Sequence, residues 1–97
     1  MFRLILDLPD ETKRIAAENF FEVKGYRFSA KAEHIRKPRI VRVGAIQNSI
    51  VLPTSDPIDK QRDAIWEKIR IIIKAAAVAG VNIICMQEAW SKYLYRK

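Results

Sequence analysis

Apolar residues recur in two different periods along the second half of the chain, and they predict a strand, a helix and a second strand. Residues 40–46 are β-branched and almost continuously apolar, as expected of a buried strand covered on both faces, and residues 81–86 have the same character. Between them, residues 58–79 carry an apolar stripe at the i, i+4, i+7 spacing of a helix. The stripe consists of Ile65, Ile69, Ile72, Ile73, Ala76 and Ala79. A connection of this length predicts parallel neighbouring strands with a right-handed crossover.

Polar and conformationally special residues set the limits of this unit. Residues 47–57 form a predicted loop, in which Asp56 is the expected N-cap and the proline after it the first helical residue. Gly80 is expected to end the helix in the left-handed conformation. Within the first strand, Arg42 indicates an end near solvent, and Gly44 indicates the close approach of another backbone or side chain.

The first 37 residues carry a weaker pattern. Residues 7–22 predict a helix capped by Asp7 or Asp10. After a short extended link, residues 29–36 predict a shorter helix, capped by its first serine and ended by Pro38. The large aromatic residues of this part are Phe20, Phe21, Tyr26 and Phe28. The sequence leaves open whether they pack on the domain that follows or on another subunit.

Length and composition narrow the class of protein. The 97 residues allow one domain with a modest core. The basic residues behind the net charge of +7 are scattered among glutamates, which favours a solvated surface over a nucleic-acid interface. One cysteine allows no intramolecular disulfide, and no apolar run is long enough for a signal peptide or a bilayer span. We therefore expect a soluble, cytoplasmic α/β protein with neither nucleic acid nor membrane as a partner.

Glu88 is the strongest candidate for chemistry. A carboxylate at the carboxyl edge of a buried strand is partly desolvated, which raises its pKa and suits it to general acid or base catalysis. Gln47 is expected beside it, although position alone favours an ordinary loop residue for Glu88. Cys85 lies within the apolar strand and is expected to be buried and structural, and His34 is expected on the surface. No metal-ligand spacing or glycine-rich phosphate loop occurs, so no metal or cofactor is expected.

Two stretches resemble a known family. Residues 37–48 (KPRIVRVGAIQN) and 80–90 (GVNIICMQEAW) are similar to the start of the β-ureidopropionase (β-alanine synthase) family, within the nitrilase or carbon–nitrogen hydrolase superfamily. Residues 6–9 (LDLP) and 25–28 (GYRF) match the lead-in of that family, so the resemblance covers about residues 6–90. A strand that ends in glutamate is common to the superfamily, whereas VNIIC and QEAW are more specific.

The resemblance implies a fold and a reaction. It implies the N-terminal part of an α-β-β-α sandwich, with a helical extension over residues 1–37 and the start of the hydrolase domain over 38–90. Such enzymes are homo-oligomers that hydrolyse N-carbamoyl-β-alanine, or its β-aminoisobutyrate analogue, to the β-amino acid, carbon dioxide and ammonia, in pyrimidine breakdown. They use a Glu-Lys-Cys triad. Glu88 matches the glutamate, the general base, whereas Cys85 does not match the nucleophile and Lys92 is too early for the lysine.

The sequence departs from the family after Trp90, where residues 91–97 form a divergent tail. The resemblance then implies an N-terminal fragment of a hydrolase, without the lysine and cysteine of the triad. We expect such a chain to be marginally folded and inactive alone. The alternative is an inactive interaction module that pairs with full-length subunits.

Overall fold

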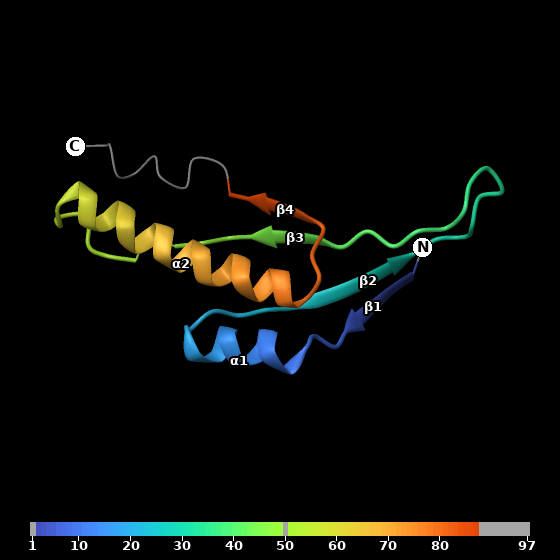
Figure 1. Cartoon of the computed structure of the whole chain (residues 1–97), viewed down its shortest axis with the longest axis horizontal. Helices are drawn as coiled ribbons and strands as arrows, with labels where there is room; N and C mark the ends of the chain where they lie inside the picture. Colours follow the sequence, from blue (N-terminus) through green and yellow to red (C-terminus); the bar gives the residue numbers. More distant parts are fainter. Residues whose placement is uncertain (1, 50, 88–97) are drawn as a thin grey trace.

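The computed structural model describes residues 2–49 and 51–87, which form two helices and four strands (Figure 1). In chain order the elements are β1 (Phe2–Leu6), α1 (Asp10–Glu18), β2 (Gly25–Ser29), β3 (Val43–Ile46), α2 (Ile58–Val78) and β4 (Ile83–Met86). The strands pair in two separate sheets, with β1 antiparallel to β2 and β3 parallel to β4. The mixed α/β class predicted from the sequence is confirmed for these residues.

The β3–α2–β4 unit is the crossover that the apolar periods predict. Strand β3 pairs with β4 in parallel from Val43 opposite Ile83 to Ile46 opposite Met86, and α2 runs back between them. Gly80 follows α2 with a φ of 79°, the left-handed conformation expected at a helix end. At Gly44 an added Cβ would lie 3.2 Å from Cγ1 of Val81, which confirms the close approach predicted there.

The core lies where α1 packs against α2 (Figure 1). Its buried apolar side chains on the helices are Ile15, Ala16, Ile65, Ile69 and Ala75. Thr12 is also buried, and its Oγ1 donates a hydrogen bond of 3.1 Å to the carbonyl oxygen of Ala75. At the other end of α1, Lys68 Nζ donates to the carbonyl oxygen of Asn19 and lies 5.4 Å from the centre of the Phe21 ring. Polar contacts therefore fix α1 on α2 at both of its ends.

The N-terminal part differs from the prediction. The segment expected as an extended link is β2, and the first residues, which the pattern did not mark as a strand, are β1. The predicted helix over residues 29–36 is wrong, because this segment is a turn and extended chain without a helix. Isolated helices of this length are marginal in water, and both of its apolar residues, Ala32 and Ile35, are exposed. The extension therefore consists of the antiparallel pair β1–β2, with α1 in the connection between the two strands. We call this strand pair the N-terminal hairpin.

Both helices begin without the predicted aspartate caps. Pro57 is the N-cap of α2 and Pro9 that of α1, and neither helix has a side-chain hydrogen bond at its cap. The backbone carbonyl oxygen of Asp56 instead accepts a hydrogen bond of 2.6 Å from Gln61 Nε2. The Oδ1 atom of Asp7 accepts a hydrogen bond of 2.6 Å from Lys13 Nζ. The extended backbone of Pro57 starts α2 one residue later than a cap at Asp56 would require, and Pro9 starts α1 between the positions that caps at Asp7 and at Asp10 would require.

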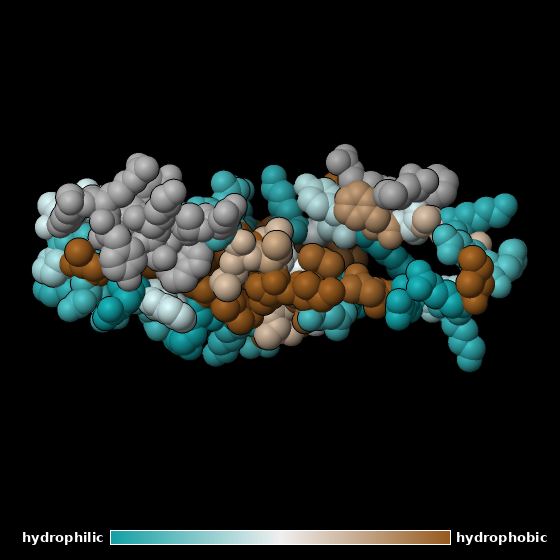
Figure 2. All heavy atoms as spheres, turned by 90° about the horizontal axis from the view of Figure 1, so that it is seen from above, coloured by the Kyte–Doolittle hydropathy of each residue, from teal (hydrophilic) through white to brown (hydrophobic). Residues whose placement is uncertain are grey.

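The molecule is elongated and leaves much apolar surface uncovered. Its radius of gyration is 16.9 Å, against about 13 Å for a compact domain of this length. It exposes 8164 Å², against about 5,700 Å² for a compact protein of its mass. Figure 2 shows apolar residues gathered along the middle of one face, and Val43, Ile83 and Met86 are among the exposed ones. The expectation that both strands are covered on both faces is therefore wrong for this chain.

Neither helix within the described ranges 2–49 and 51–87 combines the length and apolarity needed to cross a bilayer.

Candidate functional site

The carboxyl edge of the β3–β4 sheet is the candidate site. The last paired residues are Ile46 and Met86, so both strands end at the same edge, as predicted. Ile46 is buried, while Gln47 after β3 is exposed and Gln87 after β4 is half-buried. Glu88 lies outside the described residues, and its position beside Gln47 stays a prediction. The edge thus places two polar chain segments next to each other, immediately before the predicted catalytic carboxylate.

Asn48 adds a polar atom to this edge that the sequence analysis missed. Its Oδ1 is buried and accepts no hydrogen bond within the described part of the chain. A buried acceptor left in this state costs about 1–3 kcal/mol, so the position favours a donor brought from elsewhere. The signal in the sequence is the abrupt change from an apolar strand to two amide side chains, Gln47 and Asn48.

Gln61 ties the loop before α2 to the helix. Its Nε2 donates to the carbonyl oxygens of Thr54, at 3.2 Å, and Asp56, at 2.6 Å. Gln61 is fully buried, and its Oε1 has no hydrogen-bond partner among residues 2–49 and 51–87. The loop that leaves the candidate edge is therefore fixed at its far end, where it enters α2.

Cys85 is exposed, contrary to the prediction of a buried structural cysteine. It lies inside β4 opposite Ala45, one pair before the carboxyl edge, and residues 2–49 and 51–87 place no layer over its side chain. Burial was expected because the strand is apolar. That expectation assumed that another part of the protein would cover this face of the sheet. His34 is exposed in the segment after β2, as predicted.

The opposite, amino edge of the sheet has the densest polar contacts. The backbone N–H of Arg42 donates a hydrogen bond of 3.0 Å to Asn82 Oδ1. The Arg42 carbonyl oxygen accepts two hydrogen bonds, one of 2.8 Å from the backbone N–H of Asn82 and one of 3.1 Å from that of Ile83. The Arg42 guanidinium donates 3.0 Å to the carbonyl oxygen of Ala79 at the end of α2. Arg42 is exposed, which confirms the solvent-accessible strand end predicted for it.

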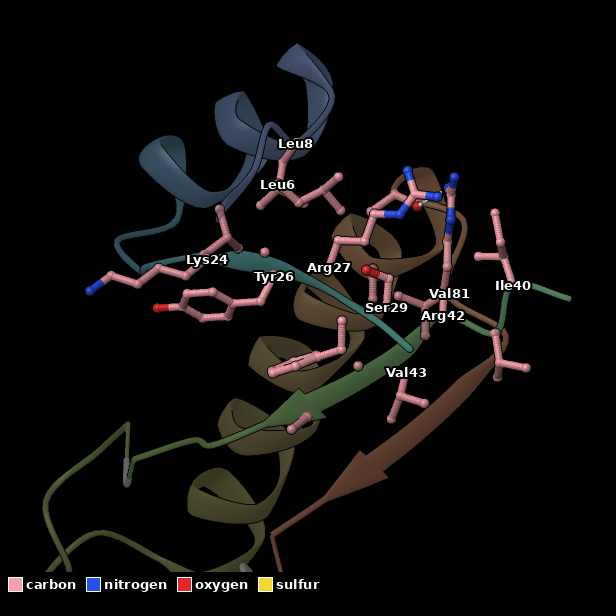
Figure 3. Close-up of a pocket in the computed structure, with 18 of the residues that line it drawn as sticks. Leu6, Leu8, Lys24, Tyr26, Arg27, Ser29, Ile40, Arg42, Val43 and Val81 are labelled. Carbon is pink, nitrogen blue, oxygen red and sulfur yellow. Dashed lines mark hydrogen bonds between the residues drawn. The ribbon is translucent and has the colours of Figure 1, made fainter. Parts of the chain in front are cut away.

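A hollow of about 1800 Å³ lies beside this edge, between β2, the segment that follows it, β3 and α2 (Figure 3). It exceeds the roughly 300–1,000 Å³ of a small-molecule site. Its lining is strongly basic, with two glutamates against seven basic residues: Lys24, Arg27, Lys31, Arg36, Lys37, Arg39 and Arg42. The size of the hollow therefore argues against a small-molecule pocket.

The carboxyl groups with shifted pKa values lie in surface ion pairs within the described part of the chain. The hydrogen bond from Lys13 lowers the pKa of Asp7, and the hydrogen bond from Arg70 lowers the pKa of Glu67. Both carboxylates are exposed on or before helices. They contribute local electrostatics and no acid–base chemistry at the sheet edge.

Comparison with known proteins supports the resemblance found in the sequence. No protein-family model matches the chain. A curated β-ureidopropionase of Arabidopsis thaliana is 50% identical to it over 84 residues, which are 87% of this chain and 21% of that protein. The resemblance to β-ureidopropionase is confirmed. The chain spans about a fifth of the length of this relative.

Proposed function

We propose that this chain supplies the general base of a hydrolase of the β-ureidopropionase type. The substrate would be N-carbamoyl-β-alanine, or its β-aminoisobutyrate analogue, and the products the β-amino acid, carbon dioxide and ammonia. The observation that carries the proposal is the 50% identity over 84 residues to the Arabidopsis protein of that name. An α-β-β-α sandwich, homo-oligomeric assembly and a cytoplasmic location belong to the same proposal.

The parallel β3–α2–β4 unit supports the role of Glu88. The paired strands end together at Ile46 and Met86, so the residues that follow leave the sheet at one edge. Ligands of open α/β sheets bind outside the carboxyl ends of the strands. A carboxylate held there can accept the proton of a cysteine thiol, which creates the thiolate that attacks the carbamoyl carbon.

The lysine and the cysteine of the triad are included in the proposal because of the resemblance to the family. A lysine would stabilise the negative charge of the tetrahedral intermediate, and a cysteine later in the sequence would be the nucleophile. Cys85 is not assigned that role, because it lies within the β4 ladder opposite Ala45. We accordingly propose that the 97-residue polypeptide alone has no turnover.

A hybrid enzyme tests the assignment. In this hybrid, residues 1–90 of the chain replace the matched stretch of the Arabidopsis β-ureidopropionase. We expect it to release ammonia from N-carbamoyl-β-alanine, and Glu88→Gln to lower kcat by about 10²–10⁴ with an unchanged circular dichroism spectrum. Glu67→Gln, on the exposed side of α2, is the matched control and should leave kcat unchanged. Near-normal turnover by Glu88→Gln would refute the role.

A second candidate function is favoured by the uncovered surface. The chain exposes apolar residues on both sheets, among them Ile5, Phe28 and Val43, and it could pair with full-length subunits as an inactive interaction module. Strand edges in this condition readily add another chain. Co-purification of the tagged 97-residue chain with the full-length Arabidopsis enzyme tests this function. Retention of the enzyme favours it, and elution of the chain alone excludes it.

A further inference from the structure

We propose that Arg42 and Asn82 form a register clamp that fixes how β4 pairs with β3 and thereby positions the carboxyl edge. The clamp lies at the amino edge of the sheet, immediately before the first pair, Val43 and Ile83. Its link to catalysis through Glu88 rests on the function proposed above. Its effect on register is a property of the fold and can be tested separately.

The β3–β4 ladder has little register information of its own. It contains four residue pairs, and both strands are apolar and mostly exposed. Register is strongly specified where one face is buried and weakly specified where neither face is. A slip by one residue would turn every side chain of β4 to the opposite face and move it about 3.3 Å along the strand. On one face Ile46 is buried and Gly44 and Ile84 are half-buried, so the ladder favours one register weakly and contacts outside it can add to the selection.

Asn82 joins the two backbones in a closed arrangement. Its Oδ1 accepts from the N–H of Arg42 while its own N–H donates to the carbonyl of the same residue. The second N–H that reaches this carbonyl comes from Ile83, the first residue of β4. These contacts secure the start of the ladder. Because they use only the backbone N–H and carbonyl of position 42, the backbone of a neighbouring residue in β3 could make the same contacts.

The side chain of Arg42 makes the arrangement specific for one register. Its guanidinium donates to the carbonyl of Ala79 at the end of α2, and the neighbouring residues Val41 and Val43 have no donor that could replace it. Gly80 leaves the space that the guanidinium occupies, because an added Cβ would lie 2.7 Å from Arg42 Nη1. Only one alignment of β3 with the end of α2 therefore satisfies the clamp.

Disulfide formation can report the register without reference to activity. Ala45 and Cys85 are opposite each other and exposed, and neighbouring strands lie about 4.8 Å apart, within the Cα separation that a disulfide allows. The native reporter is Ala45→Cys in the full 97-residue chain, which has no second cysteine. The slipped reporter is Ala45→Cys with Cys85→Ser and Met86→Cys, since position 86 faces position 45 only after a slip.

We expect the native reporter to oxidise and the slipped reporter to remain reduced. Arg42→Leu should lower the ratio of native to slipped yield by about tenfold, the effect of losing one hydrogen bond to a charged group. Arg42→Lys keeps a donor and should restore the native yield. A general loss of folding would lower the native yield without raising the slipped yield, whereas a change of register would lower the native yield and raise the slipped one.

Three results would overturn the clamp. They are a native yield that Arg42→Leu leaves unchanged, a parent chain in which both reporters oxidise equally, and a native yield that falls in Arg42→Leu without a rise in the slipped yield and that Arg42→Lys fails to rescue.

The hybrid enzyme tests the consequence for catalysis. Arg42→Leu should lower kcat, because a displacement of about 1 Å at a catalytic group already costs about 100-fold and a slip moves β4 by about 3.3 Å, and Arg42→Lys should recover it. A reporter exchange without any change in kcat would overturn the link from clamp to site. Full activity of Glu88→Gln with an intact reporter exchange would overturn the proposed function and leave the clamp in place.

Discussion

The β3–α2–β4 unit and the N-terminal hairpin with its following segment are built on different principles. In the first, a 21-residue helix buries Ile65 and Ile69 and returns the chain to a parallel partner strand. In the second, β1 and β2 pair through their backbones while Ile5 and Phe28 remain exposed. The comparison shows that apolar residues predict structure reliably where the chain itself supplies the surface that buries them.

The largest contrast is expected from truncating an isoleucine in each region. Ile65 is 1% exposed and Ile5 86% exposed. Ile65→Ala should cost about 2–5 kcal/mol of unfolding free energy, through lost burial and a cavity, whereas a surface change such as Ile5→Ala stays within about 0.5 kcal/mol. Urea unfolding of the 97-residue chain in a stabilising osmolyte, followed by circular dichroism, measures both. Equal losses would contradict the comparison.

The hydrogen bond between the helices joins the two regions. Thr12→Val removes the Oγ1 donor, while the Ala75 carbonyl keeps the backbone N–H of Ala79, so the loss should be that of one hydrogen bond, about 1.5 kcal/mol. Thr54→Val, at an exposed loop position, is the control. The same urea experiment compares the two variants. If both shift the midpoint equally, the contact does not couple α1 to α2.

Two glycines sharpen the comparison at a smaller scale. Gly80 has a φ of 79°, so Gly80→Ala should lower the free energy of unfolding by about 1–2 kcal/mol. In the hairpin, Gly25→Ala would bring a Cβ to 2.9 Å from Leu8 Cδ2, the end of a flexible side chain that can move away. We therefore expect a smaller loss at Gly25, measured as the difference in urea midpoints. A larger loss there would mean that the hairpin is packed as tightly as the β3–α2–β4 unit.

The smallest effect is a pH dependence in the turn before α1. The Lys13 hydrogen bond lowers the pKa of Asp7 below its usual 3.8 in the folded chain. The stabilisation is thus complete above pH 3.8 and is lost as the pH falls through the lower folded pKa. Asp7→Asn should reduce the drop in urea midpoint between neutral pH and about pH 2. An unchanged drop would show that the pair adds nothing.

The sequence predicts the parallel unit well and the extension poorly, for physical reasons. The burial of Ile65 and Ile69, the left-handed Gly80 and the parallel pairing depend on local periods and on the length of the connection, although Ile73 of the predicted stripe is exposed. The hairpin, the missing helix over residues 29–36 and the exposure of Cys85 depend on which surfaces are covered. Periodicity states which side chains can be buried, but the partner that buries them is not encoded in the same stretch.

The candidate site is predictable to the same extent. The shared strand end before Gln47 and Gln87 follows from the crossover pattern. The acceptor of Asn48 and the contacts of Arg42 with Asn82 do not, because they depend on side-chain geometry between distant segments. A single arginine within an apolar strand indicated a solvent-accessible end, and the structure adds the hydrogen bonds that it makes there.

The most direct test of the account is whether Gln47 and Glu88 meet at one sheet edge. Nuclear Overhauser effects between backbone amides of the isotope-labelled 97-residue chain measure this. We predict cross-strand contacts that join Ala45 to Cys85 and continue in the same register from Gln47 to Gln87 and from Asn48 to Glu88. Contacts from Gln47 to residues near Ile83 instead would place the carboxylate at the opposite edge and contradict both the fold and the proposed chemistry.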